Sequence, residues 1–156
     1  MKIAVGSDER THLTDTVVEE LRKRGHDLVL FGPLAEHDPD SDWPYTSSKT
    51  AEAVAMGRAN EGIVFCWTGT GASIAANKVA GIRAALCHDS ETARGARKWN
   101  DANIVVMSLR STPEAVAREI CDAWLEGKPD PAELPVIDKV RAMDEGARRG
   151  SVESRR

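Results

Sequence analysis

The sequence contains no hydrophobic run long enough to cross a membrane. A transmembrane helix needs about 20 consecutive apolar residues, and polar or charged residues interrupt every apolar stretch of this chain before that length. The chain begins with the strand-like run Ile3-Ala4-Val5 and lacks the basic region and long apolar segment of a secretory signal. We therefore expect a cytoplasmic protein with no membrane partner.

Features typical of disulfide-rich, metal-binding and nucleic-acid-binding proteins are also missing. The three cysteines, Cys66, Cys87 and Cys121, form no Cys-x-x-Cys pair and no cluster with metal-ligand spacing. Scattered thiols of this kind are typical of reduced cytosolic proteins, so we expect neither a disulfide framework nor a metal site. The net charge is −4 and basic residues form no stripe, so we expect no nucleic-acid partner.

What the chain does contain fits one globular α/β domain. It has 156 residues, of which 41% are hydrophobic and 29% charged. Strand-like and helix-like segments alternate, which predicts a doubly wound, five-stranded parallel sheet with helices on both faces. We expect residues 1–148 to form a single domain and residues 149–156 a disordered tail. The expected strands are 2–6, 27–31, 62–65, 82–86 and 104–107, and the expected helices are 13–23, 46–56, 72–79, 90–98, 113–125 and 136–148.

The segment from Gly62 to Lys78 carries the clearest chemical signal. An apolar strand ends at Cys66, a turn with Gly69 and Gly71 follows, and small residues then begin a helix. Glycine lets a ligand approach the backbone, and the N–H groups of such a turn and helix start can hold an anion. A thiol at this place can carry out proton or acyl chemistry. The alternative is that Cys66 is simply a small buried apolar residue.

Other polar residues follow the ends of the predicted strands. Asp8 and Glu9 come after the first strand, and Arg110 comes after the fifth. The carboxyl ends of parallel strands share one edge of a sheet, where ligands bind. Asp8 is then a candidate to take protons from substrate hydroxyls, Thr68 to donate to an oxyanion, and Arg110 to bind phosphate or carboxylate. Turn formation, a solvated loop and surface ion pairing are the structural alternatives.

A second group of residues ends the helix that enters the fifth strand from the opposite edge. Asn100 and Asp101 can cap this helix or bind a polar ligand. Trp67 and Trp99 lie in polar local sequence and can form an apolar wall of a pocket, with ordinary packing as the alternative. The topology of the sheet does not by itself place Trp99 in the same pocket as the carboxyl ends of the strands.

Four motifs occur in order over residues 1–126. They are Gly6-Ser-Asp, Cys66-x-Thr-Gly-x-Gly-x-Ser-Ile-Ala-Ala-Asn-Lys, Gly81-Ile-Arg-Ala-Ala-Leu-Cys-His-Asp and Asn100-Asp-Ala-Asn. Together they resemble the type B ribose-5-phosphate isomerase family, which includes the galactose-6-phosphate isomerases of lactose pathways. The resemblance implies a three-layer, Rossmann-like fold and a homodimer or dimer of dimers. It also implies active sites at the subunit interface and a C-terminal helix that reaches the partner subunit.

The same resemblance implies a reaction and roles for individual residues. The family interconverts aldose and ketose phosphates without a metal or other cofactor. By motif, Cys66 would be the base that moves a proton between adjacent sugar carbons, and Asp8 would handle hydroxyl protons. Asn100 would bind substrate, and Arg110 falls where the family keeps an arginine for phosphate. The enediolate would be held by the turn after the thiol, which comprises Trp67, Thr68, Gly69, Thr70 and Gly71.

Three positions depart from the family pattern. Glu9 replaces a substrate-binding histidine, and Trp99 replaces the histidine assigned to opening the sugar ring. Residues 133–140 replace a phosphate motif rich in His and Arg, and Lys139 is the plausible cation that remains there. A carboxylate at position 9 and fewer cations weaken phosphate binding. A tryptophan at position 99 makes the pocket more apolar or stacks on a sugar face.

We therefore predict a cofactor-independent aldose–ketose isomerase whose specificity is shifted from ribose 5-phosphate. Its substrate would be a short-chain sugar phosphate, a free sugar or a modified sugar. The residues expected to contact it besides the turn and Asp8 are Glu9, Trp99, Asn100, Arg110 and Lys139. The alternative prediction is a non-catalytic sugar-binding or partner subunit of the same fold.

Overall fold

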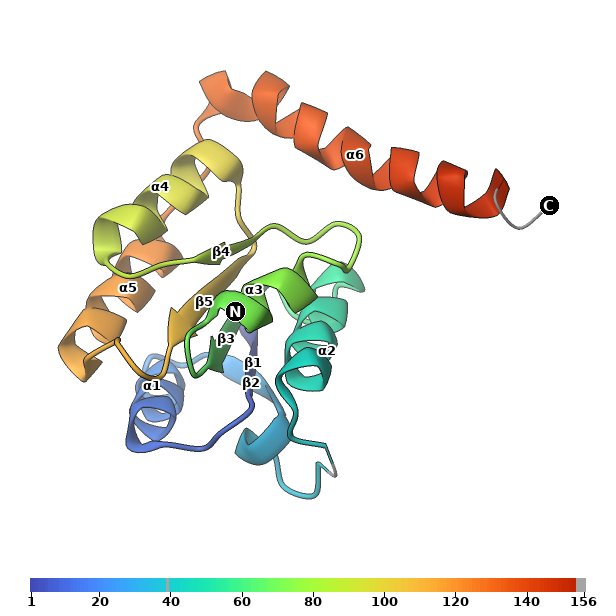
Figure 1. Ribbon diagram of the computed structural model, residues 1–156. Helices are drawn as coiled ribbons and strands as arrows, with labels where there is room; N and C mark the ends of the chain where they lie inside the picture. The colour runs from blue at the N-terminus through green and yellow to red at the C-terminus, as the bar shows by residue number, and fades with distance from the viewer. Residues whose placement is uncertain (39, 154–156) are drawn as a thin grey trace.

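The computed structural model describes residues 1–38 and 40–153, and its centre is a five-stranded sheet (Figure 1). The strands lie in the order β2-β1-β3-β5-β4, and all four neighbouring pairs are parallel. This arrangement confirms the predicted parallel sheet. The strands are β1 (Lys2–Ser7), β2 (Asp27–Phe31), β3 (Glu61–Cys66), β4 (Ala84–Leu86) and β5 (Ile104–Ser108).

Alternate residues of each central strand face two different apolar clusters. Ile63 and Phe65 of β3 belong to the cluster beneath α1 (His12–Lys23), α4 (Ser90–Asn100) and α5 (Glu114–Glu126). Val64 and Cys66 belong to the cluster beneath α2 (Trp43–Ala55) and α3 (Thr70–Ala76). Successive side chains of a strand point to opposite faces, so β3 is buried along its whole length. The predicted three-layer, Rossmann-like α/β architecture is confirmed.

Helix α2 begins at Trp43, three residues earlier than the predicted start at residue 46. Asp42 caps the helix because its Oδ1 accepts a hydrogen bond of 2.7 Å from the N–H of Tyr45. Pro44 lies in the first turn, where its missing N–H removes no helical hydrogen bond. A stretch rich in Pro and Asp therefore initiates a helix instead of prolonging the predicted loop, and the short 3-10 helix Gly32–Leu34 occupies the start of that loop.

Helix α2 packs directly on β1. The Thr50 hydroxyl fills the space that a Cβ at Gly6 would need, and it donates a hydrogen bond of 2.7 Å to the carbonyl of Thr46. Because α2 runs antiparallel to the strands, this contact brings its first turn to the edge where β1 and β3 end.

Helix α6 (Leu134–Glu153) follows a 3-10 turn (Pro131–Glu133) and extends past the rest of the molecule in Figure 1. The prediction ended this helix at residue 148. Residues 149–153 of the predicted tail are therefore helical, and residues 154–156 lie outside the described residues. None of the helices that the structure describes is long and apolar enough to cross a bilayer.

One face of α6 is attached to the body and another is open. Ile137 is 2% exposed. Arg141 Nη2 donates a hydrogen bond of 2.6 Å to Asp101 Oδ2, and the N–H of Gly81 donates one of 2.7 Å to Asp144 Oδ2. The adjacent stripe of α6, spaced at helical intervals, is apolar and exposed, and consists of Val136, Val140 and Met143.

Candidate active site

Asp8 and Cys66 are neighbours at the carboxyl edge of the sheet. Ser7, the last residue of β1, pairs with Phe65 of β3, so Asp8 and Cys66, the next residue of each segment, lie at the same edge of the sheet. Cys66 faces the α2 and α3 layer together with Val64, and Asp8 directly follows the end of β1 with its Oδ1 buried. The predicted meeting of these two groups at one edge agrees with the strand register.

The thiol of Cys66 is almost enclosed in a single chain. Its residue is 5% exposed and packs in the apolar cluster with Ala72 of α3. Its carbonyl accepts a hydrogen bond of 3.0 Å from the N–H of Leu109. Both of the alternatives weighed for Cys66 therefore have structural support: the residue packs like a small apolar side chain, and it also stands where the strand meets the glycine turn.

The turn from Trp67 to Gly71 has a conformation that needs glycine. Gly69 has φ = 79°, in the left-handed region, and a Cβ there would collide with Leu86 Cδ1. The turn is tied to β5 through the carbonyl of Trp67. That carbonyl accepts hydrogen bonds of 3.0 Å from the Arg110 N–H and 2.8 Å from Ser108 Oγ.

The N–H groups of this turn are available to an anion. Within residues 1–38 and 40–153, the N–H groups of residues 68–72 donate to no protein acceptor. The first N–H groups of a helix have no intrahelical partner, and here they follow Cys66, whose thiol is a reactive group, closely in the sequence. Thr68 Oγ1 lies 2.8 Å from Thr70 Oγ1, and both threonines are exposed. This arrangement can stabilise a negatively charged oxygen.

Asp8 is placed to hold and release a proton. Its Oδ1 is buried without a hydrogen-bond partner in the described structure. Burial raises the pKa of Asp8 above its ordinary value of 3.8, and the negative charge of Glu9 acts in the same direction. Glu9 itself is exposed, and its N–H and carbonyl both bond the Ser7 hydroxyl, which shapes the turn.

Arg110 supplies the cation at this edge. Its side chain is exposed, and its backbone is held against the turn by the bond to Trp67. Among the described residues, no carboxylate forms an ion pair with Arg110. A guanidinium in this position can bind a phosphate in a bidentate manner.

The other predicted binding residues lie elsewhere in the chain. Helix α4 starts at the carboxyl edge and has 11 residues. Asn100 at its end is therefore about 15 Å away from that edge along the helix. Trp99 is 54% exposed, and its ring lies over Gly95. It lines a shallow hollow of about 590 Å³ together with Leu86, Thr92 and Asn100.

Lys139 lies on α6, with its side chain exposed. Helix α6 is anchored next to this second group, because Arg141 bonds Asp101, the neighbour of Asn100. A single chain thus carries two separate sets. The first set comprises Asp8, Glu9, Cys66, Trp67, Thr68, Gly69, Thr70, Gly71 and Arg110, and the second set comprises Trp99, Asn100 and Lys139.

One residue at the carboxyl edge was missed by the sequence reasoning. Trp43 begins α2, and its ring packs against Gly71, where a Cβ would lie 3.0 Å from Trp43 Cε3. The cap at Asp42 followed by Pro44 is the sequence signal that places the start of a helix here. No group of three or more His, Cys, Asp or Glu residues in the described part of the chain is placed to bind a metal ion.

A protein-family model described as Ribose/Galactose Isomerase matches residues 3–139 of this chain. The chain belongs to this family. The family assignment confirms the resemblance drawn from the four motifs and the isomerase class that it implies.

Individual relatives agree with this assignment. D-erythrulose-4-phosphate isomerase of Pectobacterium atrosepticum is 37% identical over 131 residues, covering 82% of this chain and 84% of the relative. Ribose-5-phosphate isomerase B of Escherichia coli is 39% identical over 125 residues, covering 80% and 83%. The structure of ribose-5-phosphate isomerase B from Clostridium thermocellum has a TM-score of 0.85 and 37% identity, covering 94% of this chain and 99% of that one.

Proposed function

We propose that this protein is a cofactor-independent aldose–ketose isomerase of sugar phosphates, with Cys66 as its base. The observation that carries the proposal is the juxtaposition of Cys66, Asp8 and a turn whose N–H groups have no protein acceptor in the described structure. Membership of the family and the names of the relatives support the class of reaction.

The reaction has two proton transfers at carbon and a relay of one proton from the C2 oxygen to the C1 oxygen. The Cys66 thiolate takes the proton from C2 of the aldose, the C1–C2 double bond forms, and the C1 oxygen becomes negative. Thr68 and the N–H groups of the turn stabilise this enediolate oxygen. Asp8 then takes the proton of the C2 hydroxyl and delivers one to the C1 oxygen. As the C2 carbonyl forms, the Cys66 thiol returns its proton to C1, which gives the ketose.

We infer that a second copy of the chain completes the site, in a homodimer or dimer of dimers. In one chain Asn100 ends α4 about 15 Å along the helix from the edge where Cys66 lies, and Lys139 lies on α6, so the second set is separated from the first in this conformation. The exposed apolar stripe of α6, Val136, Val140 and Met143, supports the idea that this helix contacts the partner. In a two-fold dimer, each chain would then give its second set to the partner's first set.

The substrate that we favour is an open-chain sugar phosphate rather than ribose 5-phosphate. An indole at position 99 cannot act as an acid or base toward a ring oxygen, so Trp99 does not help to open a ring. A four-carbon sugar that carries phosphate on O4 has no free hydroxyl with which to close a five-membered ring. The name of the 37% identical Pectobacterium relative, a D-erythrulose-4-phosphate isomerase, supports a substrate of this size.

Exchange of solvent deuterium into sugars tests the proposed chemistry. The wild-type protein is incubated in deuterium oxide with four-, five- and six-carbon aldoses and ketoses, with and without phosphate, and C–D formation is followed by NMR. We expect exchange at the carbon next to the carbonyl, fastest with an open-chain phosphate. Faster turnover of ribose 5-phosphate than of a tetrose 4-phosphate would contradict the proposed specificity.

Two cysteine variants assign the base. Cys66→Ala should abolish exchange, whereas Cys121→Ala is the matched control. Cys121 lies on α5, and burial raises the pKa of its thiol to about 12, so it is not a base near neutral pH. Full exchange in Cys66→Ala would eliminate the thiol mechanism.

The enclosure of Cys66 favours one other function, a non-catalytic sugar-binding or partner subunit. In that case sugars bind, as measured by calorimetry, but no deuterium enters them. The same experiment therefore separates the two proposals.

A further inference from the structure

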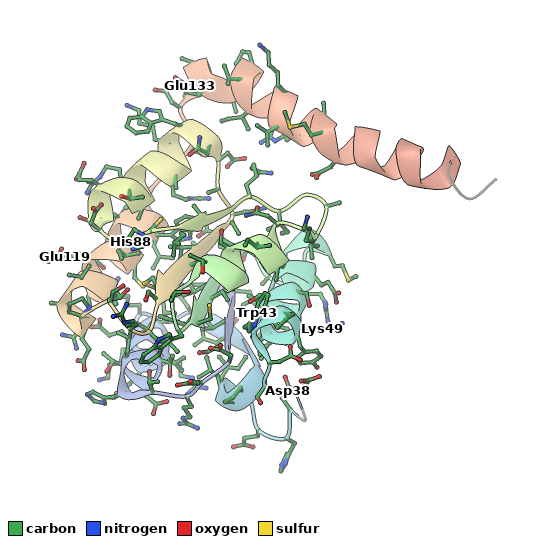
Figure 2. All side chains as sticks on the ribbon, viewed as in Figure 1. Asp38, Trp43, Lys49, His88, Glu119 and Glu133 are labelled. Atoms are coloured by element: carbon green, nitrogen blue, oxygen red, sulfur yellow. The ribbon has the colours of Figure 1, made fainter. Side chains whose placement is uncertain are left out.

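Trp43 stands at the carboxyl edge of the sheet, although it is far from Cys66 in the sequence. It is the first residue of α2, and the Asp42 cap fixes the direction in which this helix starts. Figure 2 shows the labelled Trp43 side chain between α2 and α3. The position follows from the backbone of α2 and does not depend on a flexible loop.

The indole lies directly on the glycine turn. A Cβ built on Gly71 would be 3.0 Å from Cε3, 3.2 Å from Cδ2 and 3.3 Å from Cζ3 of Trp43. All three atoms belong to the six-membered ring, so the ring faces the α-carbon of Gly71. The N–H of Gly71 is one of those that donate to no protein acceptor in the described part of the chain. The indole therefore borders the N–H groups that are proposed to hold the enediolate.

Much of this ring is not covered by protein. Trp43 is 43% exposed. It also lines an open hollow of about 530 Å³ with Tyr45, Ile74 and Lys78. An apolar side chain of this size gains considerable free energy when its remaining surface is covered. None of residues 67–71 lines that hollow, so the ring borders the hollow on one side and the turn on another, and a ligand bound over the turn would cover the part of the ring beside Gly71.

We propose that Trp43 is a specificity-determining residue, whose indole forms one wall of the substrate site beside Gly71 and limits the length of sugar that fits. This proposal rests on the proposed function, because it uses the turn as the place where the sugar binds. The indole has no group that exchanges protons with carbon or oxygen of a sugar. Its effect is therefore on binding and on the choice among substrates, rather than on proton transfer.

Steady-state kinetics of the whole chain test whether Trp43 forms a wall of the substrate site. The substrates are four-, five- and six-carbon aldose phosphates, and the variants are Trp43→Ala and Trp43→Phe. For Trp43→Ala we expect KM of the preferred sugar to rise about tenfold, the equivalent of one aromatic contact. The kcat stays close to that of the wild type, and preference among the three chain lengths narrows. Trp43→Phe keeps a smaller ring and gives an intermediate preference.

Ile74→Ala is the matched control. Ile74 is 61% exposed and lines the same hollow, but it lies on α3 beyond the turn. Its removal should leave KM, kcat and chain-length preference unchanged. An equal loss of selectivity in Ile74→Ala would show that the hollow as a whole, and not the indole beside Gly71, sets the preference.

Other outcomes overturn the proposal directly. Unchanged KM and unchanged chain-length preference in Trp43→Ala would show that Trp43 does not form a wall of the substrate site. A changed molar mass of Trp43→Ala, measured by light scattering, would also contradict the proposal, because the indole would then act in assembly. If the wild type catalyses no isomerisation, calorimetry with the same sugar phosphates decides the matter. Weaker sugar binding by Trp43→Ala than by Ile74→Ala would support the role of Trp43 in the binding site although the proposed reaction has failed. Equal binding by the two variants, or no binding, would refute both the role of Trp43 and the proposed function.

Discussion

Arg97 and Glu61 form an ion pair of 2.7 Å between Nη2 and Oε1, with only 11% and 12% of the two side chains exposed. The pair joins the last turn of α4 to the start of β3. The guanidinium also donates to the carbonyl of Ala102 at 2.6 Å and lies 5.1 Å from the centre of the Trp124 ring. Burial raises the pKa of Glu61, and the charge of Arg97 opposes that rise.

Removal of one partner of this pair is expected to be costly. Arg97→Ala leaves the Glu61 carboxylate buried without its cation, and we expect the free energy of unfolding to fall by about 3–5 kcal/mol. Urea denaturation followed by circular dichroism measures the loss. The double variant Arg97→Met with Glu61→Leu removes both charges and should recover most of it. Equal stability of Arg97→Ala and the wild type would show that the pair contributes little.

Asp8→Asn is expected to stabilise the protein at neutral pH. Burial raises the pKa of Asp8, so the folded protein binds this proton more tightly than the unfolded chain does. The favourable contribution of Asp8 is complete below its ordinary pKa of 3.8 and is lost as the pH rises through the raised value. The difference in unfolding free energy between Asp8→Asn and wild type should therefore grow from acidic to neutral pH.

Urea titrations at a series of pH values measure this difference. Glu9→Gln is the matched control, because Glu9 is the adjacent carboxylate and is exposed. A difference for Asp8→Asn that does not change with pH, or that shrinks toward neutrality, would contradict the expectation. Loss of isomerase activity in the same stabilised variant would identify Asp8 as a residue kept for function at the expense of stability.

Mixed subunits test whether two chains share each active site. Cys66→Ala inactivates the first set of residues, and Asn100→Ala impairs the second. If the sets come from different chains, a mixed dimer has one intact site and one site with both defects. Random exchange of subunits should then restore about a quarter of the wild-type activity per chain.

The two variants are purified separately, combined in equal amounts, and assayed before and after reversible dissociation. Recovery above the sum of the parent activities supports a shared site. If both sets acted within one chain, no mixed dimer would contain an intact site, and activity would stay at the level of the parents.

Gly69→Ala is expected to destabilise the turn in two ways. A non-glycine residue is strained at φ = 79°, and its Cβ would collide with Leu86. Gly57 has φ = 70° and has no neighbour within 4 Å of an added Cβ. Gly57→Ala therefore measures the strain alone, about 1 kcal/mol, and Gly69→Ala should cost more than that in thermal or urea unfolding. Equal losses would mean that Leu86 moves aside freely.

The first set of candidate site residues could be predicted from sequence because it depends on local order. Asp8, Cys66 and Arg110 each lie at or just after the end of a strand, and parallel strands bring their carboxyl ends to one edge whatever the details of packing. The glycines of the turn are also local signals, since Gly69 occupies a backbone region that other residues avoid.

The contact between Trp43 and Gly71 could not be predicted in this way. It depends on how α2 and α3 pack, and on a helix start within a segment whose Pro- and Asp-rich composition is typical of a loop. The length of α6 was also underestimated, because residues 149–153 bear little apolar periodicity to mark a helix. The direction of the helix that ends at Asn100 predicts its separation from Cys66, and the predicted interface between subunits stays a prediction for a single chain.

The hydrogen bonds to the Trp67 carbonyl fix the orientation of the peptide unit between Trp67 and Thr68. A peptide unit is planar and trans, so its carbonyl and the following N–H point in opposite directions. Two donors from the end of β5 hold this oxygen. The N–H of Thr68 must therefore point away from β5, and it cannot rotate without giving up both bonds. Folding therefore fixes the direction of the Thr68 N–H, so a negatively charged oxygen that binds at the turn meets a dipole that needs no reorientation.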